Sequence, residues 1–143
     1  MFRAYCDGGA KKNPGLAAIG IVILDKNYNI LEEYKECIGE ATNNVAEYKA
    51  LIKALELLTK YTRGEIDIYM DSELVINQVN RKYRIKEKHL LELFEEVRNK
   101  AKTFKKITYN LTERNNEFQK IADELVNEAY LKCDIDIWSK DGN

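Results

Sequence analysis

The sequence is short of cysteine, histidine and long apolar runs, and these shortages narrow the class of protein. Its three cysteines, Cys6, Cys37 and Cys133, are odd in number and widely spaced. This spacing fits neither a zinc site nor the disulfide framework of a small secreted protein, so we expect buried thiols. No apolar stretch approaches the roughly 20 residues of a membrane span, and the first residues lead into a predicted strand rather than a signal peptide. We therefore expect a cytoplasmic protein with no membrane contact.

Length and charge set further limits. A chain of 143 residues with 45% hydrophobic and 33% charged residues fits one globular domain, 1–143, in which residues 131–143 form a C-terminal tail. The net charge of −1 at pH 7 argues neither for nor against a nucleic-acid partner, because such binding depends on a local basic patch. A monomer is the default expectation.

The N-terminal part predicts three strands in an antiparallel meander. Residues 2–7 form a short extended run that ends on an aspartate, and residues 17–25 form a nearly continuous apolar run suited to a sheet interior. Residues 29–38 form a more polar run that is typical of an edge strand. The polar residues between the last two runs favour a turn.

The remaining chain alternates between helices and strands. The predicted elements are a helix over 42–58, a strand over 65–71, a short helix to about 79, a helix over about 87–102, a strand over 106–111 and a helix from 118 to about 130. The long middle helix is expected to bury Leu90, Leu91, Phe94, Val97 and Ala101. This order predicts an α/β fold with a mixed five-stranded sheet, three strands antiparallel and two parallel, flanked by helices on both faces.

Four carboxylates stand at strand ends or beside buried helix faces. Asp7 and Asp71 each close a predicted strand, Glu47 lies on an otherwise buried helical stripe, and Asp123 borders the inward face of the last helix. Alone, each has an ordinary explanation: a cap or turn for Asp71, a capping box with Asn44 for Glu47, and a solvated position for Asp123. Together they would repel one another strongly unless cations neutralised them.

The chemistry of these ligands points to a hard metal ion. Oxygen ligands without histidine or cysteine favour Mg²⁺ or Mn²⁺, and shared carboxylates suit a pair of ions about 4 Å apart. Such a pair activates water and stabilises the leaving oxygen of a phosphodiester. The carboxylates therefore predict a nuclease.

Four blocks of the sequence resemble the signature blocks of the type 1 ribonuclease H family. They are Asp7–Gly15, Thr42–Glu47, Asp71–Ser72 and Ala122–Leu125, and their order, spacing and setting match over about residues 2–130. The resemblance implies a ribonuclease H-like fold and an endonuclease that hydrolyses the RNA strand of RNA/DNA hybrids, leaving 3′-hydroxyl and 5′-phosphate ends.

The resemblance also implies roles for individual residues. The four carboxylates, Asp7, Glu47, Asp71 and Asp123, would hold two Mg²⁺ ions, or Mn²⁺ in their place, and Glu47 would meet the 2′-hydroxyl beside the scissile phosphate. The residues expected along the minor groove, where 2′-hydroxyls distinguish RNA from DNA, are Gly8, Gly9, Asn13, Asn43 and Asn44. Thr42 would hold a phosphate of the DNA strand. Double-stranded RNA is an alternative substrate.

The sequence departs from the family pattern near the last aspartate. Where many members carry an auxiliary histidine, this chain has Glu113, followed by Arg114, and we take Arg114 as the candidate auxiliary residue. Others have an arginine or glutamate nearer the aspartate, and the nearby positions here are Asn116 and Gln119. The single histidine, His89, is expected to be solvated or to cap a helix.

A second departure is the connector at 80–88, which is too short for the basic protrusion of some bacterial members. Its basic residues either contact phosphates or form a solvated loop; they are Arg81, Lys82, Arg84, Lys86 and Lys88.

Two other functions stay open. A catalytically silent module that binds hybrids or double-stranded RNA is disfavoured, because binding alone gains nothing from a repulsive cluster. The ribonuclease H part of a reverse transcriptase is disfavoured by the start at Met1, which favours a free-standing enzyme.

Overall fold

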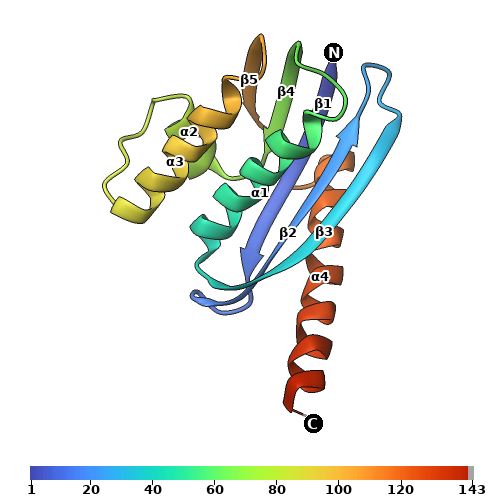
Figure 1. The fold of residues 1–143 in the computed structure, drawn as a ribbon, viewed down its shortest axis with the longest axis vertical. Coiled ribbons are helices and arrows are strands. Elements are labelled where there is room, and N and C mark those ends of the chain that lie inside the picture. The colour runs from blue at the N-terminus through green and yellow to red at the C-terminus, as the bar shows by residue number, and fades with distance from the viewer. Residues whose placement is uncertain (142–143) are drawn as a thin grey trace.

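The computed structural model describes the backbone of residues 1–141 and the side chains of residues 1–133. Within these residues the elements follow the predicted order (Figure 1). They are β1 (Phe2–Ala10), β2 (Gly15–Leu24), β3 (Ile30–Ala41), α1 (Asn43–Leu58), β4 (Glu65–Met70), α2 (Glu73–Val79), α3 (Lys88–Ala101), β5 (Lys106–Leu111) and α4 (Glu117–Asp141).

The strands form one mixed sheet in the order β3-β2-β1-β4-β5. The β1–β2 and β2–β3 pairs are antiparallel, and the β1–β4 and β4–β5 pairs are parallel. This confirms the predicted fold class. The apolar β2 lies between β1 and β3, which explains its continuous hydrophobic run, whereas the more polar β3 is an edge strand.

Helices cover both faces of the sheet (Figure 1). On one face, Ala4 and Cys6 of β1 belong to the main core, together with buried side chains of α1, α2 and α3. On the other face, Tyr5 packs against Phe118 of α4, and Ala18 of β2 packs with the same helix. Strand β1 is therefore enclosed between α1 and α4, the two helices that carry Glu47 and Asp123.

Glycine allows both helices to reach the strand backbone beside Asp7. A Cβ atom on Gly8 would overlap the carbonyl oxygen of Ala46 in α1, and one on Gly20 would overlap the carbonyl oxygen of Ala122 in α4. Gly20 pairs with Asp7 in the β1–β2 ladder. The absence of side chains at these two positions thus sets how closely the helices approach Asp7.

Three element boundaries differ from the prediction by three residues or more. Strand β1 continues past Asp7 to Ala10, because its antiparallel pairing with β2 extends that far, although its parallel pairing with β4 ends at Tyr5. Strand β3 likewise extends to Ala41. Helix α4 continues to Asp141 rather than ending near 130, and no glycine or proline interrupts it. The side chains of Ile135, Ile137 and Trp138, the apolar residues of the predicted tail, lie outside the described residues.

The buried face of α3 is also offset from the prediction. Leu90, Leu93 and Val97 are buried, whereas Leu91 is 44% exposed. Apolar residues occur on both sides of this helical stripe, so the sequence pattern fitted two slightly different rotations of the helix about its axis. The prediction that Leu91 faces inward is wrong.

A disulfide between Cys37 and Cys133 links β3 to α4. The prediction of buried thiols is therefore wrong for these two residues, and it holds for Cys6, which is free and buried. The bonded cysteines are 96 residues apart in sequence, and the fold brings their Cα atoms to 5.6 Å. Among the described residues, no helix combines the length and the apolar character needed to cross a bilayer.

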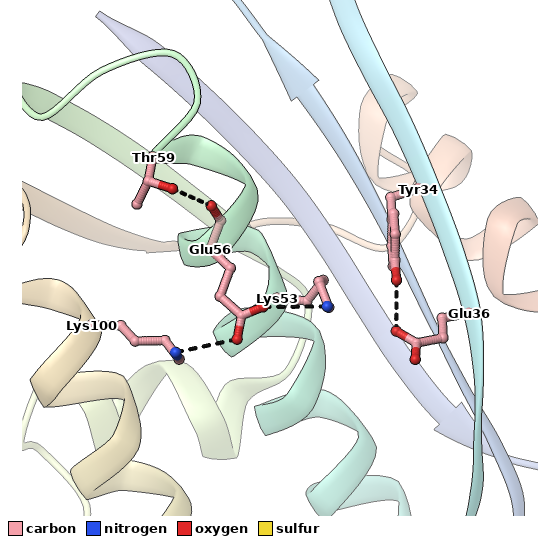
Figure 2. Close-up of polar contacts among 6 residues, drawn as sticks. All are labelled: Tyr34, Glu36, Lys53, Glu56, Thr59 and Lys100. Atoms are coloured by element: carbon pink, nitrogen blue, oxygen red, sulfur yellow. Dashed lines mark hydrogen bonds and ion pairs between the residues drawn. The ribbon is translucent and has the colours of Figure 1, made fainter.

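Glu56 of α1 forms one ion pair within its own helix and one with α3 (Figure 2). The Glu56 carboxylate of α1 lies 3.3 Å from Lys53 Nζ and 3.2 Å from Lys100 Nζ of α3. Nearby, the Tyr34 hydroxyl of β3 donates a hydrogen bond to Glu36, at 2.8 Å, and the Lys53 ammonium lies over the Tyr34 ring. In this part of the molecule, each of these two acidic side chains faces a cation or a hydroxyl donor.

Candidate active site

Asp7, Glu47 and Asp71 converge at the carboxyl ends of the parallel strands. One carboxylate oxygen from each residue lies within 4.8 Å of those from the other two. Asp7 lies just beyond the last β1–β4 pair and Asp71 directly follows β4, so the parallel pairing of these strands brings the two aspartates together. Glu47 reaches the same point from α1.

Glu47 is held at the site by the backbone of β1. Its side chain is buried, and Oε1 accepts a hydrogen bond from the Gly8 N–H, at 2.6 Å. Thr42 caps α1 instead, since its Oγ1 accepts from the Val45 N–H, at 3.2 Å. The alternative explanation of Glu47 as a capping-box residue is therefore wrong. A buried carboxylate on a helix that already has a cap has another role.

Asp123 faces this group from α4. It is not one of the three residues whose oxygens lie within 4.8 Å of one another, but its carboxylate is close enough to Asp7 to raise the pKa of that group. Asp123 is half-buried on the side of α4 that packs against β1 and β2. The structure thus brings three of the predicted carboxylates into one group and places the fourth beside it.

The electrostatics of the cluster favour a bound cation. Burial raises the pKa of Asp7 to about 7, and the charges of Asp71 and Asp123 act in the same direction. A hydrogen bond with Glu47 partly lowers this pKa again. Burial, followed by the charge of Asp7, raises the pKa of Glu47 well above its ordinary value. Burial also raises the pKa of Asp71, although Arg114 acts in the opposite direction. Each carboxylate therefore resists carrying its charge in this setting.

A hard divalent cation fits this donor set. The converging ligand atoms are all carboxylate oxygens, which Mg²⁺ and Mn²⁺ prefer, and the group contains no histidine or cysteine. A cation would also offset the repulsion that raises these pKa values. The cluster is thus a candidate metal site.

The predicted substrate residues lie around the start of α1 and the β1–β2 turn. Asn13 Oδ1 accepts from the Asn43 N–H, at 3.0 Å, and Asn43 Oδ1 accepts from the Ala10 N–H, at 2.7 Å. These bonds fix the turn against the helix start that Thr42 caps. Asn44 is exposed beside them. Gly8 and Gly9 lie in β1, next to Asp7.

Two residues near the carboxylates were not assigned a role from the sequence. The Tyr130 hydroxyl lies 2.8 Å from where a Cβ of Gly9 would be, and burial, followed by the charges of Asp7 and Asp123, raises the pKa of Tyr130 to about 12. Gln119 is fully buried against β1. Both share a helical face with Asp123, so a search for polar residues at helical spacing from Asp123 would have found them.

Comparison with known proteins places the chain in a family. A family model described as reverse transcriptase-like matches residues 5–129. The bifunctional protein Rv2228c of Mycobacterium tuberculosis is 38% identical over 124 residues, which are 86% of this chain and 34% of that protein. Ribonuclease HI of Halobacterium salinarum is 34% identical over 137 residues, covering 89% of this chain and 63% of that protein. The chain thus spans about a third of the length of the mycobacterial relative and just under two thirds of the length of the archaeal one.

Solved structures support the same family. The crystal structure of RNase H1 from H. salinarum superposes with a TM-score of 0.87 at 34% identity, covering 92% of this chain and 98% of that one. LC11-RNase H1, isolated from compost by a metagenomic approach and crystallised in complex with an RNA/DNA hybrid, superposes with a TM-score of 0.86 at 42% identity, covering 93% and 99%. This chain belongs to the ribonuclease H1 family.

Proposed function

We propose that the protein is a metal-dependent endonuclease that hydrolyses the RNA strand of RNA/DNA hybrids and leaves 3′-hydroxyl and 5′-phosphate ends. The observation that carries this proposal is the convergence of Asp7, Glu47 and Asp71 within 4.8 Å in a chain of the ribonuclease H1 family. The similarity to LC11-RNase H1, which was crystallised with a hybrid, supports the choice of substrate.

The four carboxylates would hold two Mg²⁺ ions, or Mn²⁺ in their place. When bound, such ions lower the pKa of an attacking water and stabilise the leaving oxygen. Asp7 and Asp71, which lie side by side, are assigned the positions nearest the scissile phosphate. The Gly8 N–H orients one oxygen of Glu47, and the second oxygen is assigned to the 2′-hydroxyl of the substrate. Asp123 completes the set from the opposite face of the sheet.

The surface beside the carboxylates is assigned to recognition of the RNA strand. The Gly8–Gly9 backbone and three asparagines would lie along the minor groove, where 2′-hydroxyl contacts distinguish RNA from DNA; the asparagines are Asn13, Asn43 and Asn44. Thr42 is assigned to a phosphate of the DNA strand. The hydrogen bonding between the turn and α1 supports this role, because a fixed surface loses little entropy on binding.

Arg114 is assigned the auxiliary role. It is exposed in the loop before α4, and its charge lowers the pKa of Asp71 against the effect of burial. An exposed cation beside Asp71 is suited to attract the product phosphate and help it leave the site.

The basic connector between α2 and α3 is assigned to phosphate contacts. Arg81, Lys82 and Arg84 are exposed there. Replacing all three by glutamine should reduce the slope of log affinity against log salt by about 0.9 for each phosphate that the variant no longer neutralises. Binding titrations of a hybrid from low to high salt measure this slope, and an unchanged slope would exclude the connector from the binding surface.

Cleavage of an end-labelled RNA tests the proposed activity. The RNA is supplied annealed to DNA, annealed to RNA, single-stranded, or as one ribonucleotide embedded in DNA, each with Mg²⁺, Mn²⁺ or EDTA. We expect internal cuts in the hybrid that require metal and disappear in Asp71→Asn. Binding to the hybrid without cleavage in any metal would identify a silent binding module instead. Cleavage of the RNA duplex at the same rate would exclude specificity for hybrids.

A further inference from the structure

Gln119 connects the two elements that carry Asp7 and Asp123. Its side chain is fully buried, and Nε2 donates a hydrogen bond to the carbonyl oxygen of Cys6, at 3.0 Å. Cys6 immediately precedes Asp7 in β1, and Gln119 lies one helical turn before Asp123 in α4. A single buried hydrogen bond therefore spans the two candidate metal-ligating segments.

This bond acts on the peptide group to which Asp7 belongs. The carbonyl of Cys6 and the nitrogen of Asp7 share one planar unit, so a donor held against that carbonyl limits the rotation of the Asp7 backbone. The parallel pairing of β1 with β4 ends at Tyr5. Gln119 thus contacts β1 just beyond the point where β4 stops supporting it.

Other contacts fix the distance of α4 from the sheet. The close approach of Gly20 to Ala122 sets how deeply the helix packs on β2. The Asn116 side chain accepts from the N–H groups of Phe118 and Gln119, at 2.9 and 3.2 Å, and so fixes the first turn. With the helix held in this way, Gln119 presents its amide at a fixed position against the Cys6 carbonyl, on a strand that at this point pairs with β2 but no longer with β4.

Folding stability alone does not favour a glutamine at this position. Gln119 Oε1 is buried and accepts no hydrogen bond from the residues that the structure describes. A buried unpaired carbonyl costs roughly 1–3 kcal/mol, which offsets the gain of about 0.5–1.5 kcal/mol from the Nε2 hydrogen bond. The Nε2 donor is the part of the amide that makes a specific contact, and this contact is with the carbonyl of Cys6, the residue before Asp7.

We propose that Gln119 is a positioning residue for the candidate metal site, which sets Asp7 relative to Asp123 and thereby controls the affinity for divalent cations. This inference rests on the proposed function, because it concerns the same carboxylates. Replacing a residue that orients a metal ligand typically weakens metal affinity by about 10–100-fold. We expect an effect in this range when Gln119 is replaced.

Two variants of Gln119 and one matched control separate positioning from packing. Gln119→Met keeps the length of the side chain and removes the donor. Gln119→Leu removes the whole amide and leaves an apolar side chain of smaller length. The control is Gln78→Met. Gln78 is also buried and accepts from the Tyr48 hydroxyl, at 2.6 Å, so its bond joins α2 to α1 through the tip of a side chain and not through the backbone beside a candidate ligand.

The first measurement is calorimetric titration of each folded protein with MnCl₂ and MgCl₂ without substrate, after thermal melting has confirmed folding. We expect both Gln119 variants to bind metal about 10–100-fold more weakly, while Gln78→Met binds like the unmodified protein even if it melts earlier. At saturating metal, kcat for a hybrid should fall in the Gln119 variants with KM unchanged. If Gln119→Met is poorly folded, Gln119→Leu gives the same comparison.

The outcomes distinguish this inference from the proposed function. If Gln119→Met binds metal as tightly as the unmodified protein and has the same kcat and KM, the positioning role is overturned. The nuclease assignment would still stand. Equal reductions in metal affinity in Gln119→Met and Gln78→Met would overturn it as well, since they would indicate a general effect of packing. If the unmodified protein neither binds metal nor cleaves hybrids, both proposals fall.

Discussion

Helix α1 carries two glutamates in opposite electrostatic settings, one near each end. Glu56 faces Lys53 and Lys100 (Figure 2), and although partial burial opposes it, hydrogen bonds from Lys100 and Lys53 hold the pKa of Glu56 below its ordinary value. Glu47 faces Asp7 instead, and burial together with that charge raises the pKa of Glu47. The pKa of the same residue type on the same helix is thus shifted in opposite directions.

This difference separates scaffold from site. Where α1 joins α3, the protein supplies the cations that balance its acidic groups. Where the start of α1 meets the ends of β1 and β4, it gathers three carboxylates and places a further acid, Asp123, beside them. A folded protein tolerates the second arrangement when something outside the chain provides the missing positive charge. The contrast between the two ends of α1 therefore supports a metal site at the Glu47 end.

Asp71→Asn should produce the largest effect on activity. The substitution removes one charge from the cluster and keeps the shape of the side chain, so the fold should persist while hybrid cleavage falls by at least about 10²–10³-fold, the size seen when one preorganised group that stabilises a transition state is removed. Steady-state cleavage in Mg²⁺ measures this decrease. Glu56→Gln, the same kind of exchange in the scaffold, is the control and should cleave normally. Near-normal activity in Asp71→Asn would show that the cluster is not the reaction centre.

Removing the disulfide should give the largest effect on stability. Cys37 and Cys133 close a loop with a sequence separation of 96, and the chain-entropy estimate for a loop of that size is about 4–5 kcal/mol. We expect the Cys37→Ser/Cys133→Ser variant to unfold at lower urea concentration by this order of free energy. Because neither cysteine belongs to the carboxylate cluster, hybrid cleavage at 25 °C should persist. Reductant should shift the unmodified protein in the same way and leave the variant unchanged; a reductant effect on both would contradict the assignment.

The fold was predictable because its signals are local. Continuous apolar residues in β2, the helical spacing in α1 and the aspartates that follow the parallel strands each occupy a short stretch of sequence. The offset in α3 arose where this local signal was ambiguous, since Leu91 and Leu93 both continue an apolar stripe. The extension of α4 beyond 130 shows a related ambiguity, because the tail contains residues compatible with helix but without clear periodicity.

Contacts between distant segments could not be predicted from the sequence. The pairing of Cys37 with Cys133 depends on α4 crossing β3, and the hydrogen bond from Gln119 to Cys6 depends on the depth at which α4 packs against Gly20. Neither leaves a periodic pattern in the chain. The convergence of Asp7, Glu47 and Asp71 could be predicted because their residue types match one chemistry, and because the family resemblance supplied their grouping.

Glu47→Gln should stabilise the metal-free protein. The amide oxygen of the variant can still accept from the Gly8 N–H, while the repulsion from Asp7 and the cost of burying the charge are removed. We expect a gain on the order of 1 kcal/mol, the common size of a single-residue effect, in urea unfolding with EDTA. Added Mg²⁺ should stabilise the unmodified protein, by about 2.7 kcal/mol at 100 times its Kd, and stabilise the variant less. Destabilisation of the metal-free variant would mean that the cluster is already balanced within the chain.

Glu56→Gln should destabilise the metal-free protein, in contrast to Glu47→Gln, and its effect on stability should be the smallest of those predicted. The Glu56 side chain is 41% exposed, so solvent screens its two ion pairs, and pairs of this kind contribute about 0–1 kcal/mol. We expect a decrease in stability of a few tenths of a kcal/mol at low salt that disappears in high salt, measured by urea unfolding with EDTA beside Glu47→Gln. Because both variants replace a glutamate of α1 by glutamine, differences in helix propensity largely cancel between them. If both variants change the free energy of unfolding in the same direction, the contrast between the two ends of α1 disappears. Changes in opposite directions would show that only the Glu47 end depends on a cation from outside the chain.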